Sequence, residues 1–146
     1  MFDHVLVPVD LTDRNRRALE TASRLAGEDG EVTLLHVIET LDLPFDELED
    51  FYQRLHDRAQ VEMDQMAHPL SVSGVTVIQR VSYGNRLREI LAHAEENPTE
   101  LIVMSSRRLE ISDAPTGFAT LSHQVAILSQ VPVLLVKSRA IAGIIR

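Results

Sequence analysis

The chain has 146 residues, of which 45% are hydrophobic and 25% charged, a composition typical of a globular protein with a sizeable core. It contains no cysteine, which excludes disulfide bonds and thiolate chemistry. The formal net charge is −8 at pH 7, and the segment from Glu39 to Asp64 contributes nine acidic residues against two arginines. Because an acidic surface repels nucleic-acid phosphates, we expect no nucleic-acid partner there. We interpret this segment as a solvated helix face, with a protein-docking surface as the alternative.

No apolar run approaches the roughly 20 residues that span a bilayer, so we expect no membrane segment. The first residues, MFDHVLVPVD, lack the basic and apolar regions of a signal peptide. We therefore expect a cytoplasmic protein, and residues 1–146 have a length suited to a single domain.

A continuous apolar run, Val5–Val9, predicts a first strand buried on both faces. Pro8 has no N–H to donate to a neighbouring strand, so we place it at the strand's carboxyl end. Asp10 follows directly. Thr12 is a residue type that caps helices, and the apolar stripe beyond it predicts a helix that ends at Gly27.

The second strand is predicted over Val32–Ile38, again as a continuous apolar run. A long amphipathic helix follows, with apolar residues at spacings of three and four from Leu48 to Met66. We expect this helix to stop near Pro69. Partial alternation over Val75–Val81 predicts a third strand at an edge of the sheet.

Asn85 is a natural cap for a third helix, which Asn97 and Pro98 should end. A fourth strand at Leu101–Met104, a helix at Phe118–Ser129 and a fifth strand at Val131–Val136 complete the pattern. Strands and helices that alternate in this way predict an α/β fold. We expect a single five-stranded parallel sheet of order 3-2-1-4-5 with helices on both faces.

In that strand order the first and fourth strands are neighbours at the switch point, where α/β sheets bind ligands. Asp10 ends the first strand, and Ser105 and Ser106 follow the fourth. We expect these residues to meet in one crevice.

Four stretches together carry a resemblance to a known family: VLVPVDLTDRNRRALETASRLA, VTLLHVIE, LIVMSSRR and VPVLLVK. They resemble the universal stress protein family over almost the whole chain. The resemblance implies a cytoplasmic α/β homodimer that pairs edge to edge through Val131–Val136, and in some members it implies ATP binding. Val37 and Asp10 stand where nucleotide-binding members contact adenine and ribose.

Nucleotide-binding members hold the phosphates in a glycine-rich loop after the fourth strand, where bare backbone approaches phosphate oxygens. In this chain Ser105, Arg108 and Phe118 occupy the three glycine positions of that pattern, although Gly117 lies one residue before the third. Leu11 stands where the family often has glycine. The glycine route to ATP is therefore damaged.

Arg107 and Arg108 offer a different route, since guanidinium groups bind phosphate by charge-assisted hydrogen bonds. Two hypotheses stay open. The favoured one is a non-enzymatic homodimeric regulator that acts on unknown protein partners without tight ATP binding; the alternative is a protein that binds ATP or AMP. Neither catalytic residues nor metal ligands are assigned. If a nucleotide binds, the candidate residues are Asp10, Thr12, Val37, Ser105, Ser106, Arg107, Arg108 and Gly117.

Overall fold

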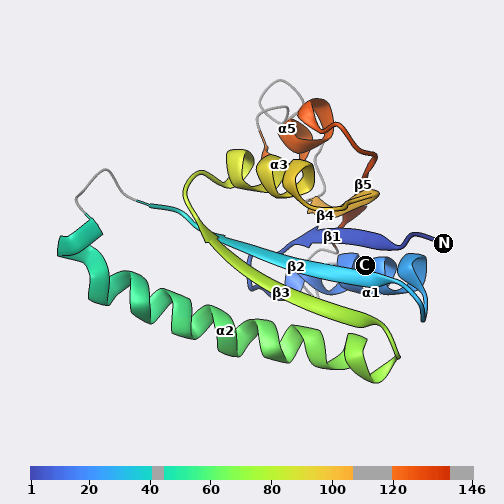
Figure 1. Cartoon of the computed structure of the whole chain (residues 1–146), viewed down its shortest axis with the longest axis horizontal. Coiled ribbons are helices and arrows are strands. Elements are labelled where there is room, and N and C mark those ends of the chain that lie inside the picture. The colour runs from blue at the N-terminus through green and yellow to red at the C-terminus, as the bar shows by residue number, and fades with distance from the viewer. Residues whose placement is uncertain (41–44, 107–119, 139–146) are drawn as a thin grey trace, which may run out of the picture.

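The computed structural model describes residues 1–40, 45–106 and 120–138. They form one five-stranded, all-parallel sheet in the order β3-β2-β1-β4-β5, which confirms the predicted fold class and strand order (Figure 1). The strands are β1 (His4–Pro8), β2 (Glu31–Ile38), β3 (Thr76–Tyr83), β4 (Leu101–Ser106) and β5 (Val133–Lys137). The helices are η1 (Asp13–Asn15), α1 (Arg16–Ala26), η2 (Phe45–Leu48), α2 (Glu49–Val72), α3 (Arg86–Glu96) and α5 (Leu121–Leu128).

Helices cover both faces of the sheet: α1 and α2 lie on one face, and α3 and α5 on the other (Figure 1). Because successive side chains of a strand point to opposite faces, β1 supplies both cores. Val5 and Val7 pack with α1 and α2, whereas Leu6 packs with α3 and α5. Burial on both faces explains why the strands are continuous apolar runs.

The sheet opens at the carboxyl end of β1. Pairing between β1 and β2 ends at Pro8 and Leu35, followed by one hydrogen bond of 2.9 Å from Val9 N to Leu35 O. Strand β2 remains paired with β3 as far as Ile38. The carboxyl ends of β1, β2 and β4 therefore leave room for a cavity at the predicted switch point.

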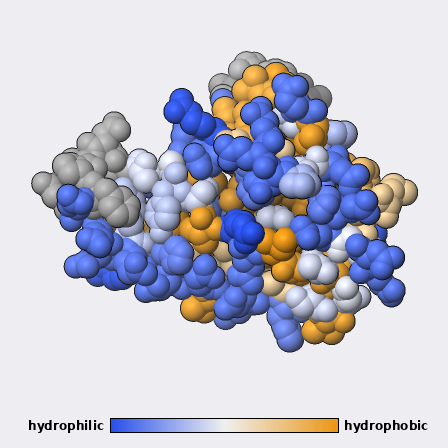
Figure 2. All heavy atoms as spheres, in the orientation of Figure 1, coloured by the Kyte–Doolittle hydropathy of each residue, from blue (hydrophilic) through white to orange (hydrophobic). Residues whose placement is uncertain are grey.

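The second helix ends near Pro69, as predicted, but it includes the proline and continues to Val72. Pro69 removes one backbone donor, and its side chain is exposed. Leu70 and Ala67, in contrast, are buried against the first core. Burial of this last turn outweighs the lost hydrogen bond. Figure 2 shows mainly hydrophilic side chains along α2 on the visible face, as expected for a solvated acidic segment.

The last two elements differ in extent from their predicted ranges. Strand β5 starts at Val133 instead of Val131, because Pro132 has no N–H to donate, although its carbonyl accepts from Ile102 N at 3.0 Å. Helix α5 covers Leu121–Leu128, within the predicted Phe118–Ser129, whose first two residues lie outside the described residues.

Candidate functional site

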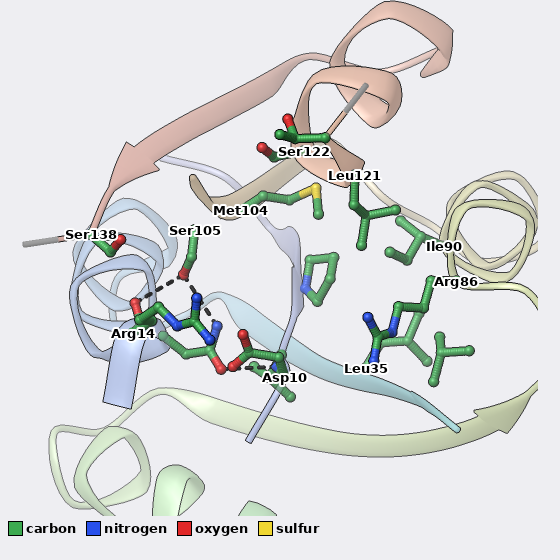
Figure 3. Close-up of a pocket in the computed structure, with 15 residues that line it drawn as sticks. Asp10, Arg14, Leu35, Arg86, Ile90, Met104, Ser105, Leu121, Ser122 and Ser138 are labelled. Atoms are coloured by element: carbon green, nitrogen blue, oxygen red, sulfur yellow. Dashed lines mark hydrogen bonds between the residues drawn. The ribbon is translucent and has the colours of Figure 1, made fainter. Parts of the chain in front are cut away.

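A cavity of about 310 Å³ lies where β1, β2 and β4 end (Figure 3). Its volume is at the lower end of the range for small-molecule sites. One part of the wall is apolar, and it is formed by Leu35, Val37, Ile90, Met104 and Leu121. The other part is polar or charged, and it includes Asp10, Arg14, Asn15, Ser105, Thr120, Ser122 and Ser138, with Arg86 next to the apolar part.

Asp10 is held by the turn that follows β1. Its Oδ1 accepts hydrogen bonds from Thr12 N at 3.0 Å and from Thr12 Oγ1 at 2.5 Å. Thr12 Oγ1 in turn accepts from Arg14 N at 3.3 Å and caps η1. Both bonds to Asp10 end on one carboxylate oxygen, so the other oxygen has no partner among the described residues and can accept a hydrogen bond from a ligand. Leu11 adopts a left-handed φ of 67° to make this turn.

Asn15 ties the end of β1 to the end of β4. Its Oδ1 accepts from Asp10 N at 2.9 Å, and its Nδ2 donates to Ser105 Oγ at 3.2 Å. Ser105 Oγ donates to Arg14 O at 3.1 Å, which closes the network. The Asn15 side chain is 2% exposed, so these bonds are shielded from water. The network fixes the position of Asp10 relative to Ser105.

The amino end of α5 faces the same cavity. Thr120 occupies the cap position, but its hydroxyl is hydrogen-bonded to His123 Nδ1 and makes no capping bond. Ser122 is only 6% exposed and also lines the cavity. The first amides of a helix carry a partial positive charge and attract anions. This wall therefore suits a phosphate group.

The charges that line the cavity contrast with those of the whole protein. Two guanidinium groups, from Arg14 and Arg86, stand against one carboxylate, from Asp10. The whole chain, in contrast, carries a formal charge of −8. Arg86 is ion-paired with Glu39, whereas Arg14 makes no ion pair among the described residues, so Arg14 is the cation available to an anionic ligand.

The structure brings three of the predicted residues together. Asp10, Val37 and Ser105 line the cavity, and Thr12 braces Asp10 from outside it. Ser106 does not line the cavity, because it is buried and its hydroxyl accepts from Lys137 Nζ at 3.3 Å. The other three candidates, Arg107, Arg108 and Gly117, lie outside the described residues.

Sequence reasoning missed several residues of the cavity, among them Arg14, Asn15, Arg86, Thr120 and Ser122. Some local signals were present. Arg14 follows the capping residue Thr12, and Arg86 follows the capping residue Asn85. Residues in the first turn of a helix after a strand point to the carboxyl edge of the sheet, which is the site edge.

A sequence model of the universal stress protein family matches residues 1–137. The chain belongs to this family. Universal stress protein YxiE of Bacillus subtilis is 29% identical over 150 residues, a match that covers 94% of this chain and all of that protein. The solved structure of the hypothetical protein MJ0577 is 25% identical, has a TM-score of 0.78, and is matched over 96% of this chain and 99% of that one.

Two further family structures contain nucleotides. One is a universal stress protein in complex with cAMP, with a TM-score of 0.67 at 18% identity and coverage of 94% of this chain and 98% of that one. The other, from Archaeoglobus fulgidus, is in complex with dAMP, with a TM-score of 0.66 at 19% identity and coverage of 92% and 97%. At these identities the likeness concerns the fold, and the nucleotides belong to those proteins.

Two other features are absent from residues 1–40, 45–106 and 120–138. No group of three or more histidine or acidic side chains is arranged there to hold a metal ion. No helix within these residues combines the length and apolar character needed to cross a membrane.

Proposed function

We propose that this universal stress protein is a cytoplasmic, non-enzymatic regulator that forms homodimers and binds an adenine nucleotide in the cavity beside Asp10. The observation that carries the proposal is the convergence of Asp10, Val37 and Arg14 on one cavity. The sequence alone favours a protein without tight ATP binding. Because of the cavity, we propose that the protein binds a nucleotide. Binding in this cavity does not require the glycine-rich loop.

The base lies at the apolar end. Val37 is two residues beyond Leu35, where pairing between β2 and β1 ends. In a parallel ladder alternate residues bond the same neighbour, so the backbone edge of Val37 faces the gap left by β1. One N–H and one C=O side by side complement the adenine edge, which offers one acceptor and one donor. The unpaired carboxylate oxygen of Asp10 suits a ribose hydroxyl.

The phosphate end is formed by the amino end of α5, by Ser105 and by Arg14. These groups suit one phosphate group close to the ribose. The family's pattern for holding further phosphates has glycines at positions that are Ser105, Arg108 and Phe118 in this chain. We therefore expect AMP to bind at least as tightly as ATP. The bound cAMP and dAMP of the two structures with the same fold support a single-phosphate ligand.

The homodimer forms through β5. Strand β5 bonds β4 through Pro132 O and Ser138 N, so alternate residues between them, Val133 and Leu135, turn their backbone groups to the open edge. The carbonyl of Lys137, at the end of the strand, accepts from Arg17 Nη1 at 2.8 Å. This edge is apolar, whereas the opposite edge strand, β3, carries Gln79 and Arg80. An apolar open edge needs a partner, and a second copy provides one by two-fold pairing.

Calorimetric titration with AMP, ADP and ATP tests the nucleotide proposal. We expect a dissociation constant for AMP below about 100 μM, equivalent to about −5.5 kcal/mol. Asp10→Asn keeps the acceptor for Thr12 but lowers the negative charge beside the ribose, and we expect weaker AMP binding. Failure of the wild-type protein to bind any of the three nucleotides would overturn the proposal and leave a regulator that acts through protein contacts alone.

A further inference from the structure

Arg86 lies beside the apolar end of the cavity, away from the groups that suit a phosphate. It is the first residue of α3, directly after Asn85, whose side chain caps the helix by accepting from Arg88 N at 3.0 Å. In Figure 3, Arg86 lies on the side of Leu35 and Ile90, across the cavity from Ser105. Arg14, in contrast, lies on the side of Ser105 (Figure 3), so the two arginines are at different parts of the cavity wall.

A single ion pair orients the Arg86 side chain. Its Nε lies 3.5 Å from Oε1 of Glu39, and the two side chains are 50% and 52% exposed. Glu39 directly follows β2, two residues after Val37, so the pair bridges the strand next to the base and the helix across from it. Guanidinium has five donors, and this ion pair involves only the Nε end of the group. Among the described residues Arg86 has no other polar partner, so its two terminal nitrogens and its flat face are open to a ligand.

We propose that Arg86 stacks its guanidinium plane on the nucleotide base and so makes the site select ligands that carry an aromatic base, with Glu39 as the positioning residue. This inference rests on the proposed nucleotide function and adds a residue to the same site. Leu35, Val37 and Ile90 form the apolar end of the cavity, and Arg86 lies beside them, so a base held there would meet both apolar side chains and a planar cation. Arginine stacks on aromatic faces through its delocalised plane, and lysine lacks that plane.

The base interaction can be separated from the general attraction of a cation for a phosphate. Ribose 5-phosphate has the sugar and the phosphate of AMP without the base. If Arg86 acts on the base, its loss weakens AMP binding and leaves ribose 5-phosphate binding unchanged. If it acts as a remote positive charge, its loss weakens both ligands equally.

The experiment is calorimetric titration of AMP and of ribose 5-phosphate into the wild-type protein and the variants Arg86→Ala, Arg86→Lys and Arg88→Ala. Loss of an arginine–aromatic contact typically costs roughly 2-fold in affinity at exposed sites and roughly 30-fold at desolvated ones. Because Arg86 is half exposed, we expect Arg86→Ala to bind AMP about fivefold more weakly. Arg86→Lys should weaken AMP binding nearly as much as Arg86→Ala does, because lysine lacks the guanidinium plane. Arg88→Ala removes the same charge from the same helix, but Arg88 lines a shallow groove on its outer face, so AMP affinity should stay within about twofold. Circular dichroism verifies that each variant is folded.

The outcomes separate this inference from the proposed function. AMP binding by the wild type together with an unchanged affinity in Arg86→Ala, or an equal loss for AMP and ribose 5-phosphate, would overturn the role of Arg86 and leave nucleotide binding standing. Absence of AMP binding by the wild type would overturn both.

Discussion

Asn15→Ala tests the network that positions Asp10. The substitution removes two hydrogen bonds, to Asp10 N and Ser105 Oγ, from a side chain that is 2% exposed. Each buried hydrogen bond contributes about 1 kcal/mol, and a buried donor left without an acceptor costs a further 1–3 kcal/mol or so. Asp10 N loses its acceptor, but its bond to Asn15 is part-buried, so the lower end of this cost applies. Two lost bonds and one such donor predict that the free energy of unfolding falls by about 3 kcal/mol.

The assay is urea unfolding followed by circular dichroism, with Asn97→Ala as the control. The Asn97 side chain also has two polar contacts, a hydrogen bond to His93 O at 3.1 Å and a contact with His93 Nδ1 at 3.3 Å, but it is exposed to water. Its loss should cost less than about 1 kcal/mol, because water replaces the lost bonds. Equal costs for the two variants would refute the view that Asn15 is a buried tie between β1 and β4.

Three further predictions concern the turn, the pH dependence and the dimer. Leu11→Gly should be more stable than Leu11→Ala by about 1 kcal/mol, because only alanine strains at the φ of 67°; equal urea midpoints would contradict this. Burial, and next the nearby charge of Arg80, lowers the pKa of His93 in the folded protein. The unfolded chain therefore binds the proton more readily, and the free energy of unfolding should fall as the pH drops below about 6.5. In His93→Gln that fall should be smaller, and an unchanged pH profile of the urea midpoint would count against the assignment. Leu134→Lys, on β5, should convert the dimer to monomer in sedimentation velocity, whereas Val72→Lys, on the end of α2, should not; a monomeric wild type at micromolar concentration would remove the dimer proposal.

Much of the fold follows from local patterns in the chain. Strands buried on both faces are continuous apolar runs, and their alternation with helices restricts the topology to a doubly wound sheet. Asp10 was predicted at the site because it directly follows β1, and position after a strand decides position at the carboxyl edge. Helix α2 runs past Pro69 because Leu70 is buried against the first core. This burial is a tertiary effect, which local helix propensity does not contain.

The missed site residues depend on geometry between distant segments. Asn15 reaches both Asp10 and Ser105 only because Leu11 turns the chain with a left-handed φ. Leucine rarely adopts this conformation, so its presence in the sequence does not predict the turn. Arg86 comes near Val37 only after β2 and β3 have paired and α3 has packed on the face of the sheet that α1 and α2 leave open. Ser106 looked equivalent to Ser105, but strand alternation turns the two side chains to opposite sides.

Backbone-amide NMR of nitrogen-15-labelled protein with AMP tests the central claim most directly, since it locates the ligand and detects its binding together. At about 1 mM AMP, tenfold above the expected limit of the dissociation constant, we predict shifts at Asp10, Val37, Ser105 and Ser122, all of which line the cavity. Amides on the outer face of α3, such as those of Ala92 and Glu95, should stay unchanged. A spectrum without shifts, or with shifts confined to the outer face of α3, would contradict a nucleotide site at the carboxyl ends of β1, β2 and β4.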